Sequence, residues 1–429
     1  VSNGSPLSTT VGFSFADGGQ AETFRWVADG GGRWGDLANW ENVADPAKQL
    51  TEPPHAEDLV YFPTNPGLCT VTVDGDYGAR RLANLFEGTL AEPLHFVLDL
   101  GGHAFDFSEP EDQSFASVQT ASYTSPFDKS QPPSVIEIRN GTVTSSRLSD
   151  LAIGGAGGVI LSNVVMSANL KHWSTGSRLT LLGGSVLNIL TKDLWVNNAG
   201  SGWNGYLRVA EQSIVSNSTH NVYMNGGNSH IYVEDGGRFV CSTLELGFLD
   251  STNAAVVVDG GTFCAAGEVK MSCGTESVHA SHHSRLAISG EKGCVRFESY
   301  FTVRSDSGAR VDIDMPVNGF RDDNGDLREG LYFRKFAQTY YGDGVSAYEP
   351  FAVNVSCRDW ARAHPNETAP IVRLRRTGID DYETRLTAFT NAVRIVDKAH
   401  ATLSVVVDGD DAVVSLTAAP WQGLILSFR

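Results

Sequence analysis

The sequence predicts an all-β protein, a single-stranded parallel β-helix with three strands per coil. The middle of the chain repeats at about 25 residues, and every second residue of its short segments is apolar. Glycine pairs end several segments, at Gly183-Gly184, Gly236-Gly237 and Gly260-Gly261, where a sharply turning chain needs a positive φ. An antiparallel sandwich also predicts regularly spaced strands, but not a three-step pattern with one period. Because parallel crossovers are usually right-handed, we expect a right-handed helix.

Each copy of the repeat contains three apolar steps, whose members point to one face of a strand. The first step comprises Leu194/Val196, Val222/Met224, Leu244/Leu246, Val269/Met271 and Phe301/Val303. The second comprises Leu207/Val209, Ile231/Val233, Ala255/Val257, Leu286/Ile288 and Val311/Ile313. The third comprises Ile214, Phe239, Phe263 and Val295. A coil of this kind buries its apolar face only against its neighbours, so stability is predicted to be collective.

Three regions follow from this pattern. Residues 1–63 are predicted to form an N-terminal tail and an aromatic cap, residues 64–330 the parallel β-helix with inserted loops, and residues 331–429 terminal coils with a C-terminal cap. Within the last region, residues 380–393 have helical spacing of apolar residues. The Asp408-Gly409-Asp410-Asp411 turn between two alternating segments predicts a β-hairpin.

Three tryptophans in the first region allow two interpretations. Trp26, Trp34 and Trp40 are large enough to cover the open end of a solenoid, where strand edges and core are exposed. Their flat faces also suit stacking against pyranose rings, so they are the candidate carbohydrate-binding residues. The cap is the favoured interpretation.

Composition restricts the partners. The net charge of −18 argues against nucleic acid, since phosphate binding requires clustered Lys and Arg, and it disfavours anionic polysaccharides unless a local basic patch exists. No apolar run is long enough to span a membrane. Low charge content and abundant Gly, Ser, Thr and Asn are typical of a secreted bacterial β-protein, so an extracellular or cell-surface location is expected. Six cysteines are too sparse for a disulfide framework; buried thiols are favoured over one or more disulfides.

Both ends of the chain resemble a known group. The segments that carry the resemblance are Trp26, Trp34-Gly35-Asp36, Asn39-Trp40, Asp58-Leu59-Val60 and Val71-Thr72-Val73-Asp74-Gly75 at the start, and Ala369-Pro370-Ile371-Val372-Arg373-Leu374, Leu403-Ser404-Val405-Val406-Val407-Asp408-Gly409 and Gly423-Leu424-Ile425-Leu426 at the end. They are similar to secreted bacterial β-solenoid surface proteins of the autotransporter-associated β-strand repeat group. The resemblance implies a secreted or cell-surface β-helix and transfers no catalytic residue.

Candidate metal-binding and catalytic residues are less clearly marked in the sequence. Asp322, Asn324 and Asp326 alternate in a Gly-containing loop and are the candidate Ca²⁺ ligands, although a polar turn is the favoured explanation and no cofactor is otherwise expected. Polar residues near strand ends include Lys192, Asp193, Arg208, Glu211, His230, Glu234, Asp235, Arg304, Asp312 and Asp314. Outward positions of any solenoid are polar, so this set does not identify a catalytic site.

The sequence therefore predicts a secreted or cell-surface β-helix with a structural or adhesive role, able to associate end to end into fibres. One alternative is a polysaccharide lyase or glycoside hydrolase that acts in a groove along the β-helix. Another is a non-catalytic module that binds a polysaccharide or cell-surface glycan. Of these functions, the sequence favours the non-enzymatic ones.

Overall fold

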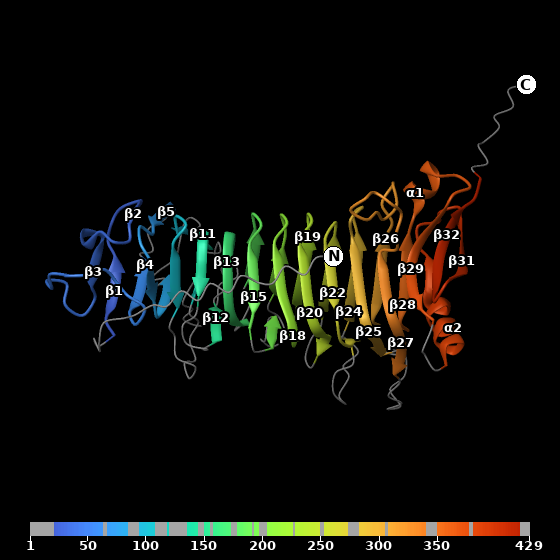
Figure 1. The fold of residues 1–429 in the computed structure, drawn as a ribbon, viewed down its shortest axis with the longest axis horizontal. Helices are drawn as coiled ribbons and strands as arrows, with labels where there is room; N and C mark the ends of the chain where they lie inside the picture. The colour runs from blue at the N-terminus through green and yellow to red at the C-terminus, as the bar shows by residue number, and fades with distance from the viewer. Residues whose placement is uncertain are drawn as a thin grey trace, which may run out of the picture.

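The computed structural model describes residues 21–62, 67–84, 94–107, 118–119, 135–144, 150–154, 158–172, 178–190, 193–196, 204–225, 228–248, 253–272, 283–304, 308–339, 350–376 and 381–420. The regular structure of these residues is strands β1 to β32, two α-helices and one 3-10 turn, η1 (Leu37–Asn39). Strands lie side by side across an elongated body, with the first strands at one end and both helices at the other (Figure 1). The predicted all-β class is confirmed.

The strands form three rows, here called the first, second and third walls, in which nearly all neighbours are parallel. The first wall contains, in order, β2 (Gly31–Arg33), β5 (Gly67–Thr72), β8 (Leu94–Asp99), the start of β11 (Val135–Thr144) and of β13 (Gly158–His172), β14 (Arg178–Leu182), β17 (Asn204–Val209), β19 (Asn228–Glu234), β21 (Asn253–Asp259), β24 (His283–Ser289), β26 (Arg310–Asp314), β28 (Ala352–Ser356) and β30 (Val393–Ile395).

The second wall follows the first along the chain in most coils. It contains β6 (Tyr77–Ala79), β9 (Ala104–Phe107), the later parts of β11 and β13, β15 (Val186–Ile189), the starts of β18 (Ile214–Asn225) and β20 (Arg238–Phe248), β22 (Thr262–Ala265), the starts of β25 (Cys294–Arg304) and β27 (Leu331–Thr339), and β29 (Thr368–Arg375). It ends with β32 (Asp411–Ala418) and β31 (Ala401–Asp408), which are antiparallel.

The third wall contains the remaining strands. Near the N-terminus it contains β3 (Trp40–Asn42), β1 (Thr23–Trp26), β4 (Leu59–Phe62), β7 (Arg81–Asn84), β10 (Val118–Gln119), β12 (Asp150–Gly154) and the end of β13. Further along it contains β16 (Leu194–Val196), the ends of β18 and β20, β23 (Val269–Met271), and the ends of β25 and β27. The predicted first, second and third apolar steps thus lie on the third, first and second walls respectively.

Tight turns join the first wall to the second, and glycine is required in them for two reasons. Gly236 and Gly260 have φ values of 77° and 69°, as expected for the first member of each pair. In these two pairs the second member is needed for close approach instead: a Cβ would lie 2.2 Å from the Val209 carbonyl oxygen at Gly237, and 2.6 Å from the Val233 carbonyl oxygen at Gly261. The turn geometry therefore depends on both glycines, for different reasons.

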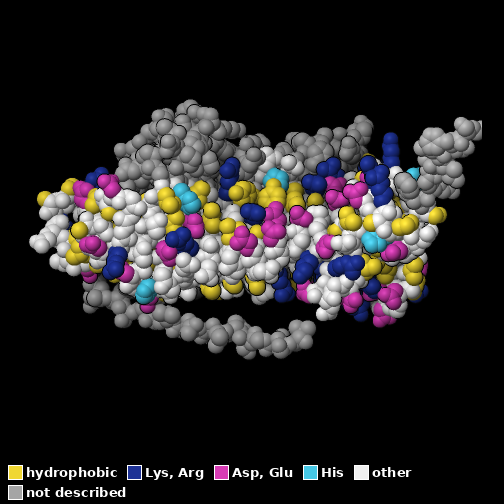
Figure 2. All heavy atoms as spheres, turned by 90° about the horizontal axis from the view of Figure 1, so that it is seen from above, with side chains coloured by type: hydrophobic (Ala, Val, Ile, Leu, Met, Phe, Trp, Pro, Cys, Tyr) yellow, Lys and Arg dark blue, Asp and Glu magenta, His cyan; other side chains and the backbone are white. Residues whose placement is uncertain are grey.

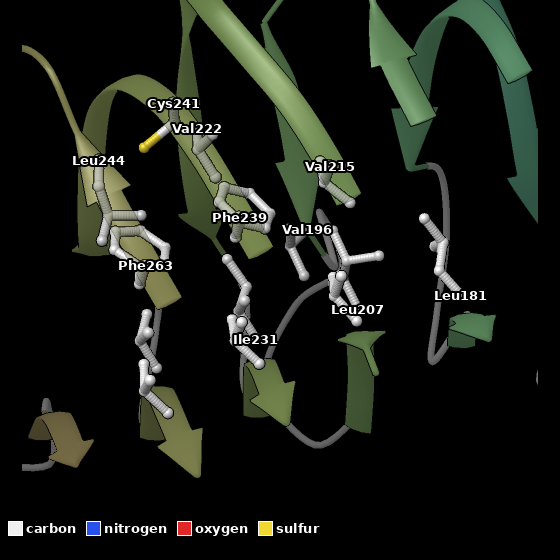
Figure 3. Close-up of a cluster of buried hydrophobic side chains, with 14 of the residues drawn as sticks. Leu181, Val196, Leu207, Val215, Val222, Ile231, Phe239, Cys241, Leu244 and Phe263 are labelled. Carbon is white, nitrogen blue, oxygen red and sulfur yellow. The ribbon is translucent and has the colours of Figure 1, made fainter. Parts of the chain in front are cut away.

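Side chains from the three walls meet in one continuous apolar interior (Figure 3). The labelled residues come from the first wall (Leu181, Leu207, Ile231), the second wall (Val215, Phe239, Cys241, Phe263) and the third wall (Val196, Val222, Leu244). All of them are essentially inaccessible to solvent. The core extends along the body, so that the described strands of all three walls share one interior.

Two predicted core positions are wrong by one residue. In β21 the inward residues are Val256 and Val258, while Val257 is partly exposed and pairs with Tyr232. In β18 the buried residue is Val215, in register with Phe239, rather than Ile214. Both segments are apolar at consecutive positions, so alternation could not define which residues face inward.

The N-terminal end is packed with aromatic rings. Trp26 and Trp34 contact Trp40 edge to face, with ring centroids 4.9 and 4.7 Å from it. The Trp40 Nε1 donates a hydrogen bond of 2.7 Å to the Trp34 carbonyl oxygen, and Trp34 Nε1 donates to the Pro54 carbonyl oxygen. Strands β1 and β3 pair antiparallel here, so the chain reverses direction at this end of the third wall.

At the other end, the predicted hairpin and helix are confirmed. β31 and β32 pair antiparallel from Ala401/Ala418 to Asp408/Asp411, with Gly409 in the turn at a φ of 60°. Helix α2 (Tyr382–Ala392) buries Phe389 against Phe333 and Phe336. Helix α1 (Arg358–Ala363) buries Trp360.

The three-part division of the chain stays a prediction. Parallel pairing runs across both proposed boundaries, because β4 pairs with β7 and β25 pairs with β27. Residues 11–15 and 424–428, and most of residues 108–133, lie outside the described residues.

Candidate functional site

The outward side of the first wall gathers the polar and aromatic side chains that best qualify as a site. Its strands alternate, so residues between the buried ones project away from the core. Parallel register then places Arg178, Tyr206 and His230 in one row across β14, β17 and β19. Arg208 and Tyr232 occupy the next outward row of β17 and β19. Residues from successive coils are thus brought into contact.

Tyr206, His230 and Tyr232 form what is here called the aromatic patch. The Tyr206 and Tyr232 rings meet edge to face with centroids 5.9 Å apart, and His230 stacks on Tyr232 with the ring planes 10° apart. The guanidinium of Arg178 lies 5.9 Å from the Tyr206 ring centroid. All three members are partly exposed. Partly exposed rings beside hydrogen-bonding groups are suited to a sugar, which has both apolar and hydroxyl-bearing faces.

A cavity of about 600 Å³, here called the arginine pocket, opens further along the same wall. Its lining includes Arg285 of β24, Arg310 of β26 and Arg394 of β30. Asp312 Oδ2 lies 2.6 Å from Arg285 Nε and 3.1 Å from Arg310 Nε, so two guanidinium groups share one carboxylate. Asn354 links this carboxylate to Arg394: its Nδ2 donates to Asp312 Oδ1 at 2.8 Å, and its Oδ1 accepts from Arg394 Nε at 2.7 Å.

A second cavity, here called the acidic pocket, lies at the opposite end of β24, β26 and β28 and has a volume of about 480 Å³. Asp314 and Glu291 line it, together with Asp359 and Asp397. Burial raises the pKa of the Asp314 carboxyl, and the negative charges of Asp397, Asp359 and Asp259 add to this effect. The outward face therefore changes sign along its strands, from arginine at their starts to carboxylate at their ends.

Asp397, which lines the acidic pocket, stabilises the start of helix α1. Its Oδ2 accepts hydrogen bonds from the backbone amides of Cys357 and Arg358, at 2.6 and 2.5 Å. These are otherwise unpaired donors at the start of α1, so the carboxylate caps that helix. Asp314 is the carboxyl in this pocket whose protonation is favoured by its surroundings.

The tryptophans predicted to bind carbohydrate are core residues. Trp26, Trp34 and Trp40 are at most 5% exposed, so no ring face is available for stacking against a sugar. The glycan-platform interpretation of these residues is therefore wrong for this structure. Their mutual packing agrees with the favoured interpretation, coverage of an open end.

The predicted Ca²⁺ ligands form a compact polar turn. Asp322 Oδ1 accepts hydrogen bonds from the Asn324 and Asp326 amides, both at 2.9 Å, and Arg321 donates to the Gly325 carbonyl oxygen. The Asp322 carboxylate thus closes its own turn. Within the described ranges, no group of three or more His, Cys, Asp or Glu side chains is arranged to hold a metal ion.

The polar residues noted in the sequence fall into different environments. Arg208 Nε pairs with Glu234 Oε2 at 2.7 Å on the outer face, whereas Arg304 is buried. Lys192 lies outside what the structure describes. Sequence reasoning missed Tyr206, Tyr232, Arg285, Arg310 and Arg394. The signal was present, since each of these residues stands beside an apolar strand residue, but only register shows which of them meet.

The described cysteines are free thiols: Cys69, Cys241, Cys264, Cys294 and Cys357. Burial raises the pKa of every one of these thiols, to about 11 for Cys294 and about 12 for Cys357. The favoured interpretation of buried thiols is confirmed for Cys241, Cys294 and Cys357, whereas Cys69 and Cys264 are free but partly exposed. Cys273 lies outside the described part of the chain.

Acidic and basic side chains are interspersed along the face shown in Figure 2, without one large patch of either sign. Among the described residues, no helix has the length and apolar character needed to cross a membrane. Comparisons with protein-family models, curated proteins and solved structures find no match to this chain. Functional inference therefore depends on the geometry of the site itself.

Proposed function

We propose that this chain is a right-handed parallel β-helix with three strands per coil, and that it is a secreted or cell-surface protein with an adhesive role. The three walls of in-register parallel strands support the first part. Cysteines introduced at Tyr232 and Val257, which are in register on adjacent strands, are expected to cross-link. Cysteines at Tyr232 and Ala287, two strands apart, are expected not to. Equal cross-linking of both pairs would contradict the stacked coils.

The aromatic patch is the observation that carries the adhesive role. Tyr206, His230 and Tyr232 come from two adjacent coils and form a contiguous, partly exposed surface on a rigid wall. Aromatic side chains dominate the energetics of many recognition surfaces, because they bury a large area at low entropic cost. We infer that the patch binds neutral sugar residues of a polysaccharide or a cell-surface glycan without cleaving them.

Binding to immobilised neutral glycans tests this function. The double variant Tyr206→Ala/Tyr232→Ala is expected to lose affinity by about tenfold or more, since truncated hot-spot aromatics cost at least about 1.4 kcal/mol. Tyr300→Ala is the matched control, because Tyr300 is an exposed tyrosine on β25, outside the patch. Equal affinity of the double variant and wild type, or absence of binding to every glycan, would overturn the proposal.

A structural variant of this function is end-to-end assembly. Within the described residues β31 pairs with β32 alone, and Val405, Val406 and Val407 on it are 44 to 58% exposed. An apolar edge strand is a template for pairing with another chain. Sedimentation over a wide concentration range should show larger species for wild type and fewer for Val406→Lys. Val165→Lys is the control, since Val165 is similarly exposed but lies on β13, between two partner strands.

The acidic pocket favours glycoside hydrolysis as a second candidate function. Asp314 has a raised pKa, which suits a general acid, and other carboxylates line the same cavity. Release of reducing ends from a panel of glycans, abolished by Asp314→Asn, would favour an enzyme over a binding protein. Absence of products from every glycan that binds the protein would exclude it for those ligands.

A further inference from the structure

We propose that the arginine pocket binds carboxylate or sulfate groups of an acidic glycan. This inference rests on the proposed glycan-binding function and specifies a second ligand class on the same wall. Arg285, Arg310 and Arg394 line the pocket, and the carboxylate linked to them is that of Asp312. The cavity is thus a positively charged site in a chain of net charge −18. It is the local basic patch without which the overall charge disfavours anionic polysaccharides.

Each of the three guanidinium groups is held in place by a contact to its Nε atom. Arg285, Arg310 and Arg394 contact Asp312 or Asn354 through Nε, at 2.6, 3.1 and 2.7 Å. Within the described part of the chain these Nε contacts are the recorded hydrogen bonds and ion pairs of the three side chains, and each guanidinium carries further N–H donors for a ligand. Guanidinium groups bind carboxylate and sulfate oxygens in bidentate fashion. Side chains already held by Asp312 and Asn354 lose less entropy on binding than free ones.

The size and the remaining lining favour a sugar over other anions. A volume of about 600 Å³ lies in the range of small-ligand sites and accommodates one or two sugar rings. Asn253, which is exposed, supplies a neutral hydrogen-bonding group suited to hydroxyls. The guanidinium donors and this amide together fit an acidic sugar.

Titration calorimetry of the full chain tests the inference with three oligosaccharides of equal length: a uronate oligomer, a sulfated oligomer and a neutral one. Arg310→Gln and Arg394→Gln are expected to weaken binding of at least one acidic oligomer by about tenfold each. Arg208→Gln is the matched control, because Arg208 lies on the same wall but pairs with Glu234 away from the pocket. Added salt should weaken acidic but not neutral binding.

Two further comparisons distinguish failure of the arginine pocket from failure of the proposed glycan-binding function. Arg394 is exposed and bonded to a neutral amide, so Arg394→Gln should fold even if Arg310→Gln does not. Acidic oligomers that bind no better than the neutral one, or that bind the Arg394→Gln variant as tightly as wild type, would overturn the arginine pocket. Neutral binding that is lost in Tyr206→Ala/Tyr232→Ala would meanwhile sustain the proposed function. Comparison of the uronate oligomer with the sulfated oligomer shows whether the pocket binds a carboxylate or a sulfate group.

Discussion

Phe239 and Phe263 occupy the same register position on adjacent strands of the second wall, and their rings stack with centroids 5.2 Å apart and planes 8° apart. Both are completely buried. A contact between residues 24 positions apart in sequence is thus a nearest-neighbour contact between coils. Phe263 also contacts Phe297 edge to face, so buried aromatic contacts link successive strands of the second wall.

Truncation of one ring of this stack should be costly. Phe263→Ala is expected to lower the free energy of unfolding by about 3 to 5 kcal/mol, because it leaves a cavity that neighbouring strands cannot fill. The double variant with Phe239→Ala should show a coupling of about 0.5 to 1.5 kcal/mol in denaturant titrations. Val317→Ala, at a site that is 50% exposed, is the control and should change stability little. Strict additivity of the two phenylalanine variants would contradict direct ring contact.

Glycine at the turn after β24 should be irreplaceable for steric reasons. Gly290 and Gly184 have nearly equal φ values of 73° and 74°. A Cβ on Gly290 would lie 2.5 Å from the Gly260 amide nitrogen of the preceding coil, whereas a Cβ on Gly184 meets nothing within 4 Å. Gly184→Ala should therefore cost about 1 to 2 kcal/mol from backbone strain alone, and Gly290→Ala clearly more. Thermal unfolding that ranks the two variants equally would refute the close approach between coils.

The thiols should be protected in the folded protein. Because the thiolate is the reactive form, the raised pKa values of Cys241, Cys294 and Cys357 predict slow alkylation at pH 8 and rapid alkylation after unfolding. Site-resolved mass spectrometry after brief iodoacetamide treatment measures this. The partly exposed Cys69 serves as the internal comparison. Fast labelling of Cys241 in the native protein would show that the second wall opens locally.

Neutralising Asp314 should stabilise the protein at neutral pH. Its pKa is higher in the folded chain than the value of 3.8 expected for an unfolded one, so the folded state binds the proton more tightly. The charged carboxylate therefore destabilises the fold above the folded pKa, and this cost disappears as the pH falls through it. Because Asp314 is partly solvated, Asp314→Asn should gain only about 0.5 kcal/mol at pH 7.

The pH dependence distinguishes this effect from a local change in packing. Denaturant titrations of Asp314→Asn and wild type should converge as the pH falls well below 3.8, where the wild-type carboxyl is protonated in both states. The fully exposed Asp323, at 96% side-chain exposure, provides Asp323→Asn as a control with little effect at any pH. A stability difference for Asp314→Asn that stays constant from pH 3 to pH 8 would rule out the electrostatic explanation.

Apolar alternation and glycine pairs by themselves determined the all-β class, the terminal hairpin, the short helix near residue 382 and most inward residues, because these depend on local periodicity. Alternation failed at Ile214 and at Ala255/Val257, where consecutive apolar residues satisfy either face. Only the tertiary structure decided that the tryptophans are core, since a large ring suits an end cap as well as a sugar platform. It also decided that Arg285, Arg310 and Arg394 share one pocket, because strand register brings together residues that sequence separation does not relate.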